Sequence, residues 1–518
     1  MKKNFKPFSL AFVLMMLTGC TINISTPSSS SSSSSGSSSS SGNGNTNNDF
    51  ATQPSDAYLK NSEEYNTFWA PTSDIKIKLD FLPGALEAIE QYGKGIYEDY
   101  YFPVNVTINV NGTDYYFPEA GARRKGNMSK GDSFENGRIH YKLSFGETFD
   151  EDFYKNNTPA FYKTWKEGEK DYEERKDRTF LDMEKLDLKW NRNNDQTNLR
   201  QSYTNYLYRK NGIIAGNNTI GNVQVFKDGV STGVNLTYDI LESIDKIFIR
   251  RFFNKASSKG DLYKTTYTGA GPANFTSDAI SLSGGEYVVN SSKVGVEDSE
   301  NNYHPSYDLK TNKKTSNHAD LIKLIKTFNY DKSPAATFID TAKQLIDFDY
   351  MAKFLAISYA VGDPDDIRCN YNNAYVYFEP TTHKAFFIPY DHDRVMGITT
   401  GYGGGLMPSR GFVSTKAGGY QGDNLQENPI FWRLLINDNT QGLGRYLETI
   451  PESFNKCKEQ ILAIKNGQDF TPAAFDNYVN QFVYKGEGST SSNTANPYSY
   501  TDYYNNLIYQ ITNDPRLK

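Results

Sequence analysis

Alternating hydrophobic and polar residues mark the start of the region that can form a core. The alternation runs over residues 75–79 and again over residues 104–110, where Asn111-Gly112 ends it before the tyrosine-rich run 114–117. A hydrophobic period of two is typical of a strand with one buried face. Asn-Gly accepts the positive φ that a two-residue turn requires, so residues 104–117 are predicted to form a β-hairpin.

More strands and one helix are predicted before residue 300. Leu199, Tyr203 and Leu207 recur on one helical face together with Tyr206, which predicts a helix over residues 198–208. Runs of β-branched and aromatic residues predict further strands at 137–145, 223–226 (returning through Asp228-Gly229), 246–252 and 285–289.

Past residue 316 the hydrophobic period becomes that of a helix. The predicted helices cover residues 321–328, 348–359 (capped by Asp347), 429–437 and 454–465, and a strand pair is predicted at 374–378 and 385–388. The sequence therefore predicts an α+β fold. We expect a β-rich N-terminal lobe over residues 75–315 and an α-rich C-terminal lobe over residues 316–510.

The N-terminus has the layout of an export signal. A basic start precedes a short apolar run over residues 8–17, and Leu17-Thr18-Gly19-Cys20 follows directly, similar to a bacterial lipobox. We expect residues 1–19 to be a lipoprotein signal peptide and Cys20 to be lipidated; an ordinary signal peptide with an incidental cysteine is the alternative. Residues 20–54, rich in Ser, Gly and Asn, are expected to form a flexible tether. The predicted location is extracytoplasmic, anchored to a membrane through Cys20.

Composition narrows the classes of function. The 518 residues include 55 Lys and Arg against 61 Asp and Glu, and this acidic balance argues against nucleic-acid binding, which needs a basic stripe. Three cysteines exclude a disulfide framework, although pairing of Cys369 with Cys457 stays open. The aromatic content of 14% suffices for a sizeable core. We expect a monomer.

Oxygen-bearing side chains concentrate between residues 361 and 397. Asp365 lies on a loop with further carboxylates and amides, and Asp391 and Asp393 follow the second strand of the predicted pair. If those two strands pair, the side chains converge at one point, as a hard divalent cation such as Mg²⁺ requires. The alternative is that Asp and Asn are simply common in loops and caps.

The same stretch resembles the CotH family of atypical, secreted protein kinases. Asp365, the runs 373–377 and 388–393, and Gly397 carry the resemblance. Other segments match in the same order: Arg123–Asn127, Tyr141–Phe145, Leu199-Arg200, Glu242–Asp245 and Gly260–Lys264. The resemblance covers about residues 75–465. It implies a kinase-like bilobal fold, with ATP bound between the lobes.

The resemblance also implies catalytic and metal-binding roles. Asp365 would be the catalytic carboxylate, with Asp366 as the alternative because the tandem leaves the register open. Asn373 and Asp391 would bind Mg²⁺ or Mn²⁺, and Asp393 is a further candidate ligand.

Phosphate contacts are implied for basic residues of the first lobe. Lys142 is the preferred phosphate-binding residue, and Lys125 and Lys264 are its rivals. Glu242 would either pair with that lysine or close a turn. His392 has no expected role, since its side chain should point away from those of Asp391 and Asp393.

Three functions follow as hypotheses. The first is a Mg²⁺-dependent kinase that transfers the γ-phosphate of ATP to Ser/Thr of extracytoplasmic or cell-surface proteins. The second is a non-catalytic, kinase-like surface protein for binding or attachment. The third is a metal-dependent glycosyltransferase using Asp391 and Asp393, for which the sequence lacks an early βαβ pattern. Retention of Asp365, Asn373 and Asp391 together favours the first hypothesis.

Overall fold

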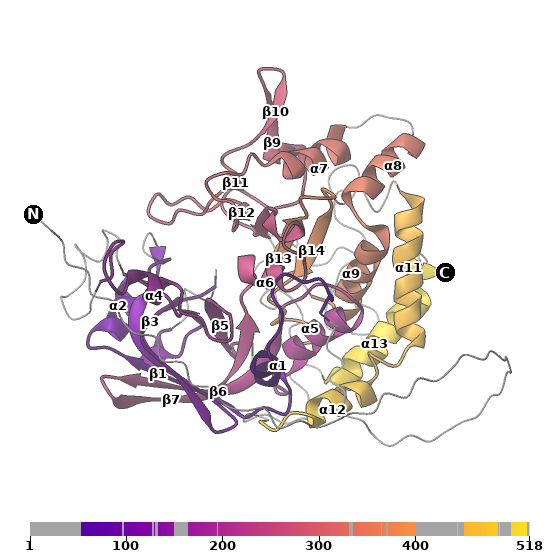
Figure 1. Ribbon diagram of the computed structural model, residues 1–518. Coiled ribbons are helices and arrows are strands. Elements are labelled where there is room, and N and C mark those ends of the chain that lie inside the picture. The colour runs from indigo at the N-terminus through magenta and orange to yellow at the C-terminus, as the bar shows by residue number, and fades with distance from the viewer. Residues whose placement is uncertain are drawn as a thin grey trace, which may run out of the picture. The chain divides into compact units, whose positions relative to one another are not determined.

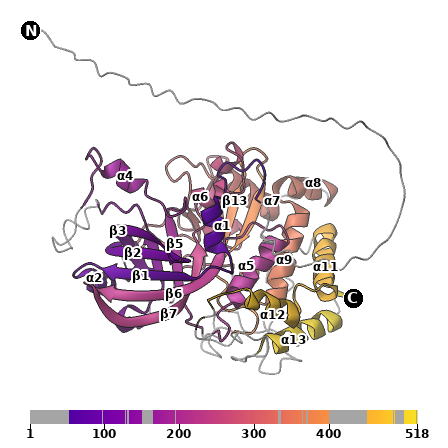
Figure 2. The ribbon, with the colours of Figure 1, turned by 60° about the horizontal axis from the view of Figure 1, so that its bottom comes forward.

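A computed structural model describes most of the chain beyond residue 52 (Figures 1 and 2). The described residues are 53–95, 98–126, 129, 133–149, 164–193, 195–330, 335–363, 365–368, 371–398, 443, 450–484, 486, 499–514 and 517–518. The chain divides into two units, 1–47 and 48–518, and everything described below belongs to the second. Cys20, Cys369 and the predicted helix at 429–437 lie outside the described residues.

Seven strands close into a barrel, seen at the left of Figure 1. Around the barrel they are β1 (Ile75–Phe81), β2 (Phe102–Val110), β3 (Thr113–Arg124), β4 (Tyr141–Ser144), β5 (Lys185–Trp190), β7 (Val230–Glu242) and β6 (Asn218–Lys227). Neighbouring strands are antiparallel, except that β1 and β6 pair in parallel and so close the barrel.

The two predicted turns are confirmed. Asn111 and Gly112 have φ of 53° and 90° between β2 and β3, where Ile108 pairs with Tyr115. Asp228 and Gly229 connect β6 to β7 in the same way. Both turns depend only on local sequence, which is why the sequence predicts them well.

Strand alternation gives the barrel an apolar interior and a charged outer face. On β5, Leu186 and Leu188 belong to the buried core formed by the barrel strands. Because side chains alternate along a strand, Lys185, Asp187 and Lys189 lie on the opposite, outer face. This outer face forms one wall of the cavity described below.

A five-stranded sheet faces part of the barrel. Its order is β11 (Val294–Gly295), β12 (Tyr307–Leu309), β8 (Leu262–Thr265), β13 (Ala374–Phe378) and β14 (Ala385–Pro389). The antiparallel pair β13–β14 confirms the predicted strand pair. Since β8 and β13 are neighbours, the sheet takes strands from both sides of residue 315; the division into two lobes stays a prediction. A separate hairpin consists of β9 (Ile280–Ser283) and β10 (Glu286–Val289), as predicted for 285–289.

Most of the helical predictions are confirmed. The described helices are α1 (Glu63–Trp69), α2 (Ala85–Tyr92), α4 (Tyr172–Lys176), α5 (Arg200–Lys210), α6 (Lys246–Arg250), α7 (Ala319–Tyr330), α8 (Ala335–Leu345), α9 (Phe348–Val361), α11 (Pro451–Asn466), α12 (Pro472–Asn480) and α13 (Tyr500–Asn513). The Asp347 side chain accepts the Asp349 and Tyr350 N–H groups and caps α9, as expected. Helix α9 packs between α5 and α11 (Figure 2). In the part of the chain described, no helix has the length and apolarity needed to cross a membrane.

Two of the predicted strands require correction. Residues 246–250 form helix α6, because the Asp245 carboxylate accepts the N–H groups of Ile247 and Phe248 and so starts a helical turn. Phe248 and Ile249 of this segment are buried and Phe252 packs against the same core, which explains why the pattern resembled that of a strand. Of residues 137–145, only 141–144 form a strand.

Substituting Gly260, which precedes β8, should disturb the pairing of β8 with β13. A Cβ atom at this position would lie 1.8 Å from the Phe378 carbonyl oxygen, and the Gly260 N–H donates to the Tyr377 hydroxyl at 2.9 Å. We expect Gly260→Ala to lower the free energy of unfolding by about 2 kcal/mol, as measured by urea denaturation. Gly269→Ala is the control, because its added Cβ has no atom within 4 Å. Equal stability of the two variants would contradict this packing argument.

Candidate functional site

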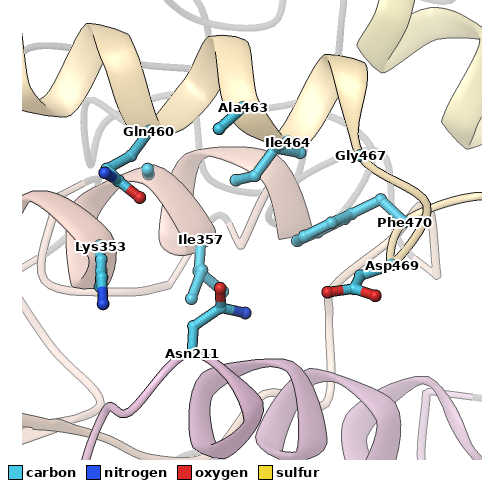
Figure 3. Close-up of a pocket in the computed structure, with 10 residues that line it drawn as sticks. Asn211, Lys353, Ile357, Gln460, Ala463, Ile464, Gly467, Asp469 and Phe470 are labelled. Carbon is cyan, nitrogen blue, oxygen red and sulfur yellow. The ribbon is translucent and has the colours of Figure 1, made fainter. Parts of the chain in front are cut away.

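A cavity of about 650 Å³ lies where the outer face of β3, β4 and β5 meets the ends of β8, β13 and β14. Its lining includes most of the residues singled out from the sequence: Lys125, Lys142, Lys264, Asp365, Asn373, Asp391 and Asp393. Glu242 and Asp366 are not among the lining residues. A smaller cavity of about 100 Å³ between α9 and α11 (Figure 3) is lined by none of the predicted residues.

Strand pairing brings the metal-ligand candidates together. Asn373 precedes β13 and Asp391 follows β14 at the same end of this antiparallel pair. The Asn373 Nδ2 donates to the Asp391 carbonyl oxygen at 3.4 Å, and both residues have positive φ, which Asn and Asp tolerate better than most residues. Asn373, Asp391 and Asp393 therefore present oxygen atoms to one end of the cavity.

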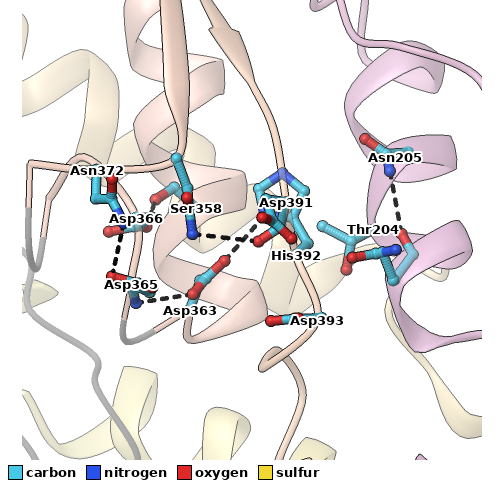
Figure 4. Close-up of polar contacts among 12 residues, drawn as sticks. Thr204, Asn205, Ser358, Asp363, Asp365, Asp366, Asn372, Asp391, His392 and Asp393 are labelled. Carbon is cyan, nitrogen blue, oxygen red and sulfur yellow. Dashed lines mark hydrogen bonds and ion pairs between the residues drawn. The ribbon is translucent and has the colours of Figure 1, made fainter. Parts of the chain in front are cut away.

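Asp363 connects the Asp365 loop to the Asp391 loop (Figure 4). One carboxylate oxygen of Asp363 accepts the Asp365 N–H at 2.8 Å, and the other lies 2.9 Å from Nδ1 of His392. The His392 ring also stacks on Tyr208, and His392 is not among the residues that line the cavity. The Asn372 Nδ2 donates to Asp365 Oδ1 at 3.1 Å and orients that carboxylate.

Asp366 has a different environment from Asp365. Its Oδ1 accepts the Arg368 N–H at 2.9 Å, and its Oδ2 lies 3.1 Å from the Arg368 guanidinium and accepts the Ser358 hydroxyl. Arg368 is fully buried. Of the two registers that the sequence left open, only Asp365 lines the cavity, whereas Asp366 balances a buried cation.

The basic wall of the cavity is formed by charged residues that lie opposite one another on neighbouring barrel strands. Arg123 is opposite Lys142 on β3 and β4, and Lys142 is opposite Asp187 on β4 and β5. The Lys142 Nζ donates to Asp187 Oδ1 at 2.9 Å and to the Ser243 hydroxyl at 3.0 Å. Asp187 also accepts the Tyr390 hydroxyl at 2.8 Å, which joins the barrel to the residue before Asp391.

Burial and the charge of the partner residue act in opposite directions on the pKa of Lys142 and on that of Asp187. Burial raises the pKa of Asp187, but the charges of Lys142 and Lys125 outweigh burial and hold it well below its usual range. Burial lowers the pKa of Lys142, and Asp187 acts against that shift. Asp187 therefore keeps its negative charge and accepts hydrogen bonds from both Lys142 and the Tyr390 hydroxyl.

Glu242 makes other contacts. Its carboxylate accepts the Tyr65 hydroxyl at 2.6 Å and the Asn217 side-chain amide at 3.0 Å, and lies 3.5 Å from Arg251. The partner of Lys142 is thus Asp187 on the neighbouring strand.

Two further lysines extend the basic wall. Lys125 lies 3.9 Å from Asp187 and 4.8 Å from the centre of the Tyr390 ring. Lys264 reaches the cavity from β8, and its pKa is lowered to about 8 by burial and by repulsion from Lys125 and Lys310. An anion bound in the cavity would relieve this repulsion.

Lys189 is central to the site and was not predicted from the sequence. Its ammonium contacts both Asp391 and Asp393, at 2.7 Å from Asp393, and its side chain is only 5% exposed. Burial raises the pKa of Asp391, yet Lys189 and Lys125 reverse that effect and hold it well below its usual range. The sequence signal was present in the run Lys185-Leu-Asp-Leu-Lys-Trp190, which alternates as a half-buried strand with charges on one face.

Asp239 lies beside Lys189 on the outer face of the barrel. It is directly opposite Lys189 in the β5–β7 pairing. Burial raises the pKa of Asp239 well above its usual range; the charges of Asp195, Asp391 and Asp393 act in the same direction, and Lys189 acts against them.

A family model described as CotH kinase protein matches residues 156–514. The chain belongs to the CotH kinase family. For this CotH family member, the match includes Asp187, Lys189 and the whole segment from Asp365 to Asp393. Two of the predicted motifs, 123–127 and 141–145, precede the matched residues. A search among curated proteins gave no match.

The donor set of this CotH family member fits a hard divalent cation. Asn373, Asp391 and Asp393 offer only carboxylate and amide oxygens, which Mg²⁺ and Mn²⁺ prefer. A second group on the same cavity, formed by Glu98, Glu297 and His304, has donor atoms within 4.8 Å of one another. Experiments on metal binding therefore need a control for this second group.

Proposed function

We propose that this CotH family member is a Mg²⁺- or Mn²⁺-dependent protein kinase that transfers the γ-phosphate of ATP to Ser or Thr of extracytoplasmic proteins. One observation carries the proposal. A single cavity joins oxygen ligands from the ends of β13 and β14 to lysines from the barrel and β8. Phosphoryl transfer uses both groups, because oxygen ligands hold the metal ion on the β- and γ-phosphates and a lysine contacts the phosphates directly.

Each group has a defined task in the proposed reaction. Asp391, Asp393 and Asn373 would hold the divalent cation, which when bound neutralises charge on the β- and γ-phosphates. Lys142 and Lys264 would contact the phosphates, with Asp187 orienting Lys142.

The carboxylate of Asp365 would act on the acceptor. It would accept the proton of the Ser or Thr hydroxyl as the acceptor oxygen bonds to the γ-phosphorus and the bond to ADP breaks. The hydrogen bond from Asn372 supports this role, because it fixes the orientation of the Asp365 carboxylate at the cavity wall.

The bilobal arrangement is part of the same proposal. The barrel would act as one lobe and the segment after residue 316 as the other, with ATP between them. In support, the cavity is lined both by residues 98–313 and by residues 365–394.

We also propose that the protein is a membrane-anchored lipoprotein facing the cell exterior. The lipobox-like run ending at Cys20 and the serine-rich tether support this location. Cys20→Ala should leave the chain unprocessed or release it from the membrane fraction, as followed by fractionation and by labelling with a fatty-acid analogue. Wild-type protein that stays unlabelled and in the cytoplasm would contradict the proposal.

One observation favours a second candidate, a non-catalytic surface protein. Lys189 already neutralises Asp391 and Asp393, and a kinase-like protein that had lost metal binding could keep such an arrangement. The two candidates differ in whether a divalent cation enters the site.

The decisive experiment combines binding with transfer. Thermal unfolding is measured with ATP alone and with ATP plus Mg²⁺ or Mn²⁺, and transfer is measured from γ-labelled ATP to a generic Ser/Thr acceptor. We expect a metal-dependent shift and labelling of the acceptor. Asp391→Asn should abolish both, whereas the control Glu297→Gln, in the second metal-ligand group, should retain them. No shift and no labelling by the wild type would favour the non-catalytic surface protein.

The pKa of Lys264 predicts how the affinity for nucleotide depends on pH. A bound phosphate favours the protonated lysine, so its pKa must rise on binding from about 8 in the free protein. The affinity for Mg²⁺–ATP should therefore fall as the pH rises through 8, by up to about tenfold per pH unit from this group. Lys142, whose pKa is lowered to about 7 by burial, adds a separate decrease that begins near pH 7. Titration calorimetry from pH 6.5 to 9.5 measures this. Lys264→Met should bind more weakly at pH 7 and lose the part of the pH dependence that begins near pH 8; an unchanged profile in the variant would assign that part to another group.

A further inference from the structure

Lys189 occupies the position that a divalent cation would need. Its ammonium contacts carboxylate oxygens of both Asp391 and Asp393 and is almost completely buried. A Mg²⁺ ion held by these two residues would lie about 2.1 Å from their oxygens, inside the space that the ammonium fills. Two cations cannot share that space, so metal binding at this point requires Lys189 to move.

The barrel offers Lys189 a second partner. Asp239 is its cross-strand neighbour on β7, and the side chains of directly opposed residues lie on the same face of the sheet, with Cβ atoms about 5 Å apart. The Oδ1 atom of Asp239 is buried and has no hydrogen-bond partner among the residues that the structure describes. A buried acceptor of this kind is costly, and a buried unpaired acceptor calls for a structural explanation.

We propose that the Lys189 ammonium has two positions: it neutralises Asp391 and Asp393 in the metal-free protein and moves to Asp239 when a divalent cation binds. This inference rests on the proposed metal site but not on phosphoryl transfer. Lys189 is then a positioning residue that keeps the two carboxylates together without metal. It also competes with the incoming ion, so Asp239 favours metal binding by accepting the displaced charge.

A double-mutant cycle tests the proposal. Binding of Mn²⁺ alone is measured by electron paramagnetic resonance in the full chain carrying Glu297→Gln. This substitution removes a ligand of the second metal-ligand group, so that the bound Mn²⁺ reports on Asp391 and Asp393. Coupling between two sites is typically 5- to 150-fold, so we expect Lys189→Met to tighten Mn²⁺ binding about tenfold or more. Asp239→Asn should weaken binding, since asparagine, unlike aspartate, cannot take on a negative charge opposite the displaced ammonium.

The combination of the two substitutions separates this mechanism from a general structural effect. In a Lys189→Met background there is no ammonium to displace, so Asp239→Asn should no longer change the affinity for Mn²⁺. Lys185→Met is the matched control, because Lys185 lies four residues before Lys189 on the same outer face of β5 and should not affect Mn²⁺ binding. Lys189→Gln provides a second neutral variant if Lys189→Met proves unstable in thermal unfolding.

Each outcome bears on the proposal. Unchanged or weaker Mn²⁺ binding by Lys189→Met, or an equal effect of Asp239→Asn in both backgrounds, would overturn it. If Lys189→Met tightens Mn²⁺ binding while the wild type transfers no phosphate, the two-position lysine stands and the kinase proposal fails. No Mn²⁺ binding by any variant, including Lys189→Met, would overturn both.

Discussion

Replacing Asp365 by asparagine should reduce phosphoryl transfer about 100-fold or more and leave the affinity for Mg²⁺–ATP nearly unchanged. Asparagine keeps the size and polarity of the side chain but cannot accept the proton of the acceptor hydroxyl, and loss of such general-base help typically has this magnitude. Binding should persist, because Asp391 and Asp393 and the lysines of the barrel are unaltered. Initial rates with γ-labelled ATP measure transfer, and titration calorimetry measures binding.

A second carboxylate on the cavity provides the control. Asp308 also lines the cavity but forms an ion pair with Lys310, so Asp308→Asn should change the transfer rate only a few-fold. If Asp365→Asn retains full transfer, or if Asp308→Asn loses as much, then Asp365 is not the residue that activates the acceptor.

The sequence predicted the features that depend on neighbouring residues. The Asn111-Gly112 turn, the Asp347 cap and the strand pair at 374–388 are each decided within a few residues. The convergence of Asn373 and Asp391 follows from that strand pair, because antiparallel pairing places the start of one strand beside the end of the next. This part of the site was therefore accessible before the structure.

Features that depend on the pairing of strands far apart in the sequence were not predicted. Closure of the barrel requires β1 to pair with β6, and the five-stranded sheet requires β8 to pair with β13. No local pattern specifies either partner. The strand at 185–190 was not predicted, and Glu242 was considered in place of Asp187 as the partner of Lys142. The role of Lys189 was not predicted for the same reason, since its contacts with Asp391 and Asp393 join segments that are far apart in the chain.

Replacing Asp366 by alanine should destabilise the whole protein. The Asp366 carboxylate is the acidic partner of Arg368, whose side chain is fully buried against α9 and also donates to the Ser358 carbonyl oxygen at 3.0 Å. Removal of the acidic partner of a buried cation typically lowers the free energy of unfolding by about 3–5 kcal/mol. Urea denaturation of the wild type and of Asp366→Ala measures this difference.

Two comparisons show whether the loss arises from the buried charge. Asp349→Ala, on the exposed side of α9, removes a surface ion pair with Lys456 and should change the unfolding free energy by no more than about 1 kcal/mol. In the double variant Asp366→Ala with Arg368→Met the buried cation is absent, so part of the stability should return. A double variant that is no more stable than Asp366→Ala would show that the loss comes from the missing hydrogen bonds of the loop. Nucleotide binding by folded Asp366→Ala at low temperature should persist, because Asp366 is not among the residues that line the cavity.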